Sequence, residues 1–245
     1  MMRWIFFVIP LFFLPVASAH WCDTYTLQTG LEYLHQNSYP SNTSAAGYAW
    51  RAGLIHQKRL PKFGYTDRLF ASWGILDGED LFDEEVRIRY MELCGEFWLD
   101  FYYRCKYACF SPLIGYGIRH HRFKKILPFE LLQEVNDFYI PIGISIECDY
   151  QENISLGARF KIEMTTYALW RYVHPVFGIK FYHLENNPAY EANAWLAWYK
   201  SERLALTFTG SFRTIDYCFS SDVPFAPESK RFYFFSAQIG GSFRY

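Results

Sequence analysis

Apolar and polar residues alternate with a period of two over most of the chain after residue 44. From Phe138 to Ile146, an isoleucine or phenylalanine occupies every second position, and most of the positions between them hold glycine, serine or tyrosine. The same alternation recurs over residues 155–164 and 204–213. Successive side chains of a strand point to opposite faces, whereas a helix cannot separate five apolar residues at strict i, i+2 spacing. The pattern therefore predicts strands with one apolar and one polar face.

The segments between these strands are mostly short and polar, which is typical of hairpins. Examples are residues 77–80, 149–153, 185–188 and 200–202. Longer connections are expected near residues 121–136 and 217–230. The strands recur about every 15–20 residues, a longer spacing than the roughly 8–12 residues of sandwiches. This spacing suits strands of about ten residues that cross a bilayer.

We predict twelve strands, with an even number preferred because it leaves both chain ends on one side of a membrane. They cover residues 24–34, 47–57, 64–76, 85–94, 96–103, 109–120, 137–148, 154–165, 174–184, 189–199, 203–215 and 231–245. The alternative is ten strands, if residues 24–34 lie outside the sheet and residues 85–103 form one long strand.

The first 19 residues have the three parts of a secretory signal peptide. Arg3 provides a short positively charged n-region, residues 4–16 are an apolar stretch, and Ala17-Ser18-Ala19 is a small-x-small cleavage site. The apolar stretch has 13 residues, too few for the roughly 20 that a spanning helix needs. We expect residues 1–19 to be removed and residues 20–245 to form one exported domain. The periplasm, the outer membrane and the medium are its possible destinations.

The last strand, residues 231–245, carries apolar and aromatic residues at most odd positions and polar residues or glycine at even positions from Ser236 onward. The chain stops on Tyr245. Here the sequence resembles Gram-negative outer-membrane β-barrel proteins, whose C-terminal strand alternates in this way, ends in Phe, Tyr or Trp and is recognised by the barrel-assembly machinery. Ile239, Phe243 and Tyr245 match this assembly signal, whereas Gly241 stands where a larger residue is usual.

The resemblance implies an all-β fold, a closed antiparallel transmembrane β-barrel in the outer membrane of a Gram-negative (diderm) bacterium. It also implies contact with outer-membrane lipids and lipopolysaccharide. Closure is required because unpaired backbone amides are very unfavourable in hydrocarbon. The alternative is a soluble sandwich whose edge strand ends in tyrosine. The resemblance is to the general class, and the oligomeric state stays open.

The composition agrees with a barrel. Apolar residues make up 51% and aromatic residues 21%, which excludes a disordered chain. The formal net charge of −1 predicts no nucleic-acid partner. A mean hydropathy of −0.10 is expected if half of each strand faces a polar lumen. Six tryptophans lie in or beside predicted strands, as aromatic girdles require, with filling of the lumen as the alternative. They are Trp50, Trp73, Trp98, Trp170, Trp195 and Trp198.

Ten charged residues fall on the predicted inner face of the strands: Arg87, Arg89, Glu147, Arg159, Lys161, Glu163, Lys180, Glu191, Arg213 and Arg244. Seven are basic and three acidic, so we expect a positively biased lumen. The function that this favours is a narrow pore for small solutes or anions, because rings of charge set selectivity in a pore. The alternative is a non-conducting structural or adhesin-like barrel whose lumen is filled by salt bridges. An outer-membrane lipid-modifying enzyme is the third interpretation.

Candidate catalytic chemistry is sparse, and we expect neither an enzyme nor a metal or cofactor site. The motifs HExxH and GxSxG are absent. His120 and His121 are neighbours, so a regular strand would point them to opposite faces. They stand among basic residues, where we expect a basic loop that contacts phosphates of lipopolysaccharide or lipid head groups.

All six cysteines follow the signal peptide, and export would take them to an oxidising space. Cys105 and Cys109 flank a predicted turn and are a possible disulfide.

Overall fold

The computed structural model describes residues 22–39, 43–79, 85–105, 108–126, 131–151, 153–174, 178–185, 187–219 and 229–245. The expected signal peptide lies outside these residues, so its presence and its cleavage stay predictions.

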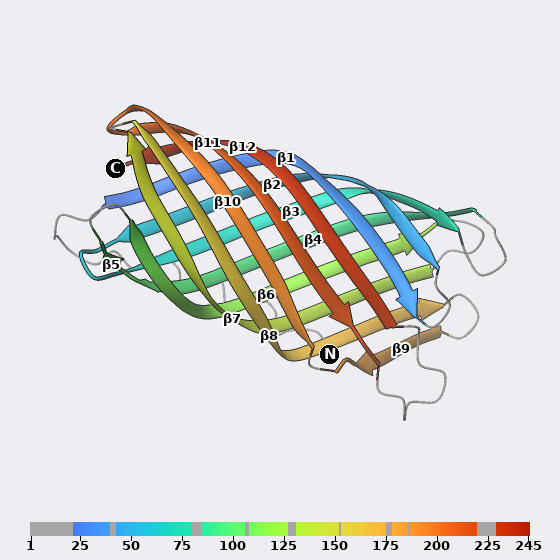
Figure 1. Cartoon of the computed structure of the whole chain (residues 1–245). Helices are drawn as coiled ribbons and strands as arrows, with labels where there is room; N and C mark the ends of the chain where they lie inside the picture. Colours follow the sequence, from blue (N-terminus) through green and yellow to red (C-terminus); the bar gives the residue numbers. More distant parts are fainter. Residues whose placement is uncertain are drawn as a thin grey trace.

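The described residues form twelve strands (Figure 1). They are β1 (Cys22–Tyr39), β2 (Ser44–Arg59), β3 (Phe63–Glu79), β4 (Glu85–Phe101), β5 (Tyr103–Arg104), β6 (Cys109–Lys125), β7 (Leu131–Gln151), β8 (Ile154–His174), β9 (Gly178–His183), β10 (Pro188–Ser201), β11 (Leu204–Tyr217) and β12 (Ser229–Arg244). No helix among the described residues has the length and hydropathy to span a membrane.

Ten of these strands close into an antiparallel barrel. Each of the ten strands pairs with the next one along the chain. The two-residue β5 and the six-residue β9 are skipped, since β4 pairs with β6 and β8 pairs with β10. β1 pairs with β12, where Thr24 lies opposite Arg244, and β8 pairs with β10, where Met164 lies opposite Pro188. The expected closed antiparallel barrel is therefore confirmed, and ten is the number of strands in its wall.

β5 and β9 continue the register of β4 and β10, respectively. β5 pairs with β6 in the same register as β4 does, and β9 pairs with β8 in the same register as β10. The predicted segments 85–94 and 96–103 therefore belong to one strand position, and so do 174–184 and 189–199. The ten-strand alternative gave the right count by a partly wrong route, because residues 24–34 lie within β1 in the barrel wall.

The connection expected over residues 121–136 is shorter than predicted. β6 runs on to Lys125 and β7 begins at Leu131, so His120 and His121 lie in a strand. The expectation of a basic loop here is wrong, because the alternation of more and less buried side chains continues to Phe123 in β6 and is present again from Gln133 in β7.

The side chains alternate across the barrel wall as the sequence predicts. Phe160 is 46% exposed on the outer face, whereas Lys161 is fully buried inside. In β12 the aromatic side chains of Phe235 and Phe243 point outward, and Ser236 and Ser242 point inward. An apolar outer face and a polar inner face are what a transmembrane barrel presents to lipid and lumen.

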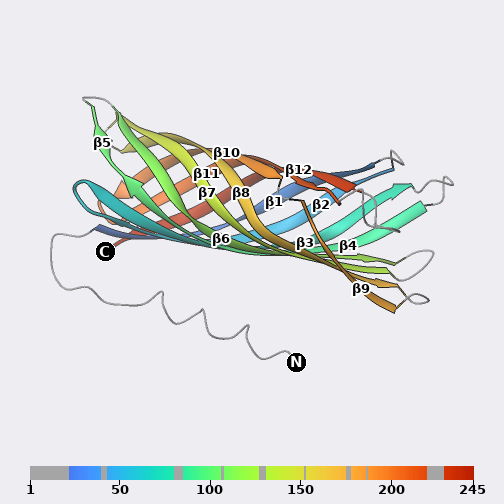
Figure 2. The same ribbon diagram turned by 90° about the horizontal axis from the view of Figure 1, so that it is seen from below.

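The two ends of the barrel differ. At one end, here the terminal end, Tyr245 lies beside Asp23 and the connections 60–62 and 202–203 are short. At the other, the loop end, the longer connection between β11 and β12 joins Tyr217 to Ser229. Figure 2 shows β9 at the loop end and the C-terminus at the terminal end.

The tryptophans divide between the two faces. Trp50, Trp73 and Trp198 are about half exposed on the outer face. Trp98 and Trp170 are fully buried inside, and Trp195 lines a cavity. The expected girdle therefore holds for the first three tryptophans, and the alternative of a filled lumen holds for the others.

Candidate functional site

Three layers of side chains follow one another along the lumen. Eighteen buried residues fill the loop end and are called here the apolar plug: Leu34, Ala45, Ala49, Leu76, Val86, Ile88, Tyr90, Phe123, Val135, Ala168, Trp170, Tyr182, Leu184, Ala189, Ile215, Tyr217, Phe232 and Phe234. A charged layer occupies the middle, and a cavity lies toward the terminal end.

The apolar plug is built largely from aromatic rings. The ring centroids of Phe123 and Phe232 are 5.0 Å apart and stacked, and those of Trp170 and Tyr217 are 5.8 Å apart and perpendicular. Both arrangements are favoured for aromatic pairs, so the plug is packed like a protein core. It also explains why β4 carries Val86, Ile88 and Tyr90 on its inner face.

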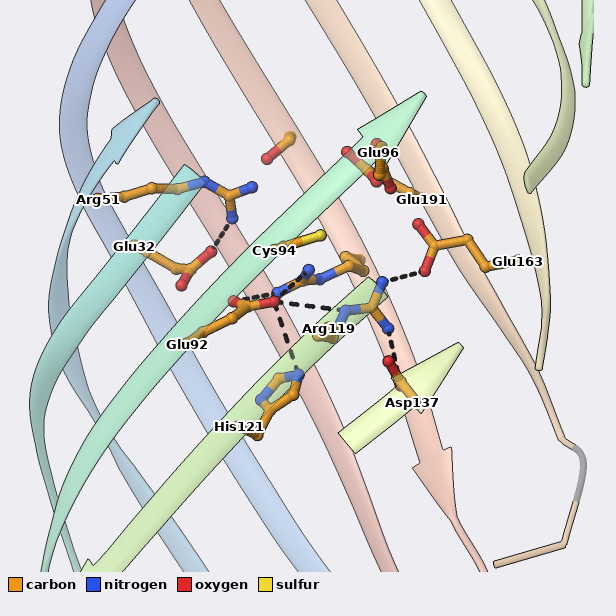
Figure 3. Close-up of polar contacts among 12 residues, drawn as sticks. Glu32, Arg51, Glu92, Cys94, Glu96, Arg119, His121, Asp137, Glu163 and Glu191 are labelled. Carbon is orange, nitrogen blue, oxygen red and sulfur yellow. Dashed lines mark hydrogen bonds and ion pairs between the residues drawn. The ribbon is translucent and has the colours of Figure 1, made fainter. Parts of the chain in front are cut away.

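The charged layer contains six acidic and five basic residues, all buried: Glu32, Arg51, Arg68, Glu92, Glu96, Arg119, Asp137, Lys161, Glu163, Glu191 and Arg213. Figure 3 shows ten residues at this level with their labels, and eight of them belong to the charged layer.

Arg119 of β6 is the centre of one half of the charged layer. Its guanidinium contacts Glu163 and lies 3.5 Å from Glu92 and 3.4 Å from Asp137 (Figure 3). Glu92 also accepts from Arg213 at 2.6 Å. Five strands therefore contribute to one ion-pair group.

Lys161 of β8 is the centre of the other half. Its Nζ lies 2.9 Å from Glu96, 3.4 Å from Glu163 and 2.8 Å from Glu191. These three carboxylates are close enough together to hold a metal ion, but the ammonium of Lys161 already contacts each of them. Arg68 adds ion pairs of 2.7 Å to both Glu96 and Glu191.

The cavity has a volume of about 160 Å³ and reaches the terminal end, where its lining includes the exposed turn residues Glu202 and Arg203. Its charged lining consists of six arginines and three acidic residues: Arg51, Arg59, Arg68, Arg159, Arg203, Arg244, Asp100, Glu147 and Glu202. Burial beside Asp100 raises the pKa of Tyr102, which also lines the cavity, to about 12. The phenol of Tyr102 therefore stays neutral at physiological pH.

Seven of the ten residues expected in the lumen do point inward. Lys161, Glu163, Glu191 and Arg213 belong to the charged layer, and Glu147, Arg159 and Arg244 line the cavity.

The other three residues do not line the closed lumen, and for Arg87 and Arg89 the expected face is wrong. Arg87 and Arg89 lie exposed on the outer face of β4, where Arg87 pairs with Asp77 at 2.7 Å. The reason is the apolar plug: near the loop end the inner face of β4 carries apolar side chains, so the charged side chains lie on the outer face. Lys180 shares the face of β9 that carries the buried Tyr182, but its side chain is exposed, because β9 is not part of the closed barrel wall.

Sequence reasoning missed most of the acidic residues of the lumen. Glu92, Glu96 and Asp100 share one face of β4, and Glu32 and Asp137 point inward from β1 and β7. Their alternation with apolar residues was a usable signal. With them counted, the middle of the lumen is not positively biased, and the excess of arginine is confined to the cavity.

The two neighbouring histidines separate as predicted. His121 is fully buried and its ring stacks on Phe123 with centroids 5.8 Å apart, while His120 contacts Asn136 at 2.9 Å. His121 Nε2 lies 3.6 Å from a Glu92 oxygen. Because they point to opposite faces of β6, the two histidines cannot bind one ligand together.

Five cysteines whose side chains the structure describes are not bonded to another cysteine in it: Cys94, Cys105, Cys109, Cys148 and Cys218. In the ladder of β5 and β6, Arg104 lies opposite Cys109, so Cys105 is one residue out of register with it. The disulfide between Cys105 and Cys109 stays a prediction. Cys94 contacts the hydroxyl of Tyr139 at 3.1 Å inside the lumen.

No family model matches the sequence, and no curated protein matches it. Solved structures of outer-membrane barrels do match the fold. The outer-membrane protease OmpT from Escherichia coli aligns with 92% of this chain and 97% of its own, with a TM-score of 0.68 and 10% identity. The chain has the fold of a Gram-negative outer-membrane β-barrel. The translocator domain of the autotransporter NalP from Neisseria meningitidis aligns with 91% of this chain and 88% of its own, with a TM-score of 0.50 and 8% identity. At such low identities, the likeness extends to the fold alone.

Proposed function

We propose that the protein is an integral outer-membrane barrel with a closed lumen, a structural or surface barrel rather than an open channel. The observation that supports this proposal is the stacking of the apolar plug on the charged layer. Together they fill the described lumen from the loop end to its middle.

Both layers oppose the passage of ions for a physical reason. An ion that crosses the apolar plug must lose its hydration shell, and hydrophobic constrictions close pores by excluding water. In the charged layer, each cation has a carboxylate partner within 4.0 Å. A permeating ion would have to break these pairs, which are fully desolvated and therefore costly to separate.

The proposal includes a membrane orientation and partners. The apolar outer face contacts outer-membrane lipids, and the terminal end faces the periplasm, because short turns are periplasmic in such barrels. The loop end then faces lipopolysaccharide and the medium. Ile239 and Phe243 point outward from β12, and Tyr245, which follows β12, is exposed, so the barrel-assembly machinery would contact all three.

A narrow anion pore is the second candidate, and the arginine-rich cavity favours it. In that case the apolar plug and the charged layer would have to move apart to connect the cavity with the loop end. The two candidates make opposite predictions for conductance.

Planar-bilayer recordings on the refolded barrel test the proposal. We expect no discrete current steps under conditions in which a reference porin conducts. Reproducible anion-selective steps that Lys161→Gln alters, while the outward control Arg87→Gln leaves them unchanged, would overturn the closed-lumen proposal and favour the pore.

A further inference from the structure

Arg159 occupies an unusual position in the cavity. Its guanidinium lies over two tryptophan rings, 4.8 Å from the centroid of Trp98 and 5.5 Å from that of Trp195. No carboxylate of the described residues forms an ion pair or a hydrogen bond with it. By contrast, Lys161 and Arg68 of the charged layer each contact two or more carboxylates.

Two more arginines at the mouth of the cavity share this property. Arg244 contacts the hydroxyl of Tyr199 at 3.5 Å, and Arg203 stands in the turn between β10 and β11. Within the described part of the chain, neither forms an ion pair with a carboxylate. The lining of the cavity therefore has three arginines that form no ion pair with a carboxylate of the described residues, although the charge of Asp100, which also lines the cavity, acts on Arg159 over a longer distance.

Several buried polar atoms of the cavity have no hydrogen-bond partner among the described residues. They include the donors Arg159 Nε and Arg244 Nε, the hydroxyl Thr207 Oγ1 and the acceptor Asp100 Oδ1. Buried polar atoms are nearly always hydrogen-bonded in folded proteins. The two arginine N–H donors thus need an acceptor supplied from outside the described residues, whereas Asp100 Oδ1 needs a donor.

We propose that this cavity binds a small anion that carries carboxylate or phosphate oxygens, with Arg159 as its main contact. The planar guanidinium presents its N–H groups in a fork that matches such oxygens. Its cation–π contacts with Trp98 and Trp195 hold the guanidinium in place. Arg203 and Arg244 attract the anion at the mouth. The ligand enters from the terminal end, because the charged layer and the apolar plug close the other side.

The dimensions of the cavity limit the ligand. A volume of about 160 Å³ is close to that of an engineered cavity of roughly 150 Å³ that holds benzene. Inorganic phosphate or a short dicarboxylate fits, whereas a lipid chain does not. The lining is rich in hydroxyl and amide groups, such as Gln28 and Asn193, which suits a hydrated, polar ligand.

This inference goes beyond the closed-lumen proposal and does not depend on it. The cavity would bind an anion whether or not the rest of the lumen conducts. A barrel that conducts and still binds anions would overturn the first proposal and leave this one standing.

Isothermal titration calorimetry on the refolded barrel in a non-ionic detergent tests the inference. The probes are inorganic phosphate and succinate, with the neutral succinamide as a control ligand. We expect saturable binding of at least one anion, no binding of succinamide, and weaker binding at higher salt.

The matched variants are Arg159→Gln and Arg87→Gln, which remove the same charge from the cavity and from the outer face. Arg159→Gln should weaken binding about tenfold or more, because a charge-assisted hydrogen bond is lost. Arg87→Gln should leave binding unchanged. If Arg159→Gln does not fold, Arg244→Gln serves in its place.

Three results would overturn the inference. They are the absence of saturable binding by wild-type protein for both anions, binding of succinamide as strong as that of succinate, and equal weakening by the cavity and the outer-face variants.

Discussion

Lys161 Nζ lies 2.9 Å from Glu96 Oε1, although β8 and β4 are separated in the barrel wall by β6 and β7. Both side chains are fully buried. The pair therefore links strands that share no backbone hydrogen bonds, and it does so across the lumen. With Glu163 and Glu191 on the same ammonium, it makes the middle of the barrel a single electrostatic unit.

Replacing Lys161 by glutamine should destabilise the barrel by about 3–5 kcal/mol, because three carboxylates would lose a buried cation. Urea unfolding in lipid vesicles, followed by heat-modifiable mobility on gels, measures this loss. The exposed ion pair of Arg87 provides the control, since Arg87→Gln removes a solvent-screened pair and should change the stability little.

The double variant Lys161→Gln with Glu96→Gln should recover part of the loss, because it also removes a carboxylate. A cost for Lys161→Gln as small as that for Arg87→Gln would mean that the middle of the lumen is hydrated and that these charges are not tightly paired.

Substitutions on the outer face of β8 test whether this face contacts the membrane. Phe160 is 46% exposed on the outer face, next to the buried Lys161. Phe160→Arg should cost about 2–4 kcal/mol if the residue lies near the bilayer midplane. Phe160→Leu is the control and should cost much less. Urea unfolding in vesicles measures both, and an arginine tolerated as well as leucine would place this face in water.

The sequence predicted the two faces of the wall because strand periodicity is a local property. Phe160 and Lys161 are neighbours, and their alternation with the flanking residues is enough to assign opposite faces. The closure into a barrel followed from the resemblance carried by β12, and the structure confirms it. The count of strands was harder, because Tyr102 separates β4 from β5, and β9 and β10 are separate strands, although each pair keeps one register.

The charge of the lumen could not be predicted in the same way. The rule that charged residues face inward and apolar residues outward in a membrane barrel places Arg87 and Arg89 on the inner face. The apolar plug reverses this rule at the loop end, and periodicity alone cannot tell which face is which. The pairing of Glu96 with Lys161 and the isolation of Arg159 depend on distances across the lumen, which no local pattern contains.

If the apolar plug is packed like a core, substitutions at two adjacent phenylalanines of β12 should differ in their cost to stability. Phe234 is 2% exposed inside the plug, whereas its neighbour Phe235 is 48% exposed on the outer face. Phe234→Ala should cost about 3–5 kcal/mol, the usual range for a buried phenylalanine, because it leaves a cavity among aromatic rings. Phe235→Ala should cost less, and urea unfolding compares the two. Equal costs would contradict a packed plug.

The end of β12 tests the assembly signal. Phe243 is 44% exposed on the outer face, where it lies opposite Tyr25 of β1 and Leu204 of β11 at the seam of the barrel. Replacing Phe243 and Tyr245 by serine should reduce the heat-modifiable protein in the outer-membrane fraction to a small part of the wild-type level, because the closing strand loses aromatic groups that face lipid and the assembly machinery. Arg244→Gln changes the residue between them, which points into the cavity, and should leave the level unchanged. If the serine variant reaches the membrane normally while Arg244→Gln does not, closure depends on the inner face of β12, and the signal proposed for its outer face is wrong.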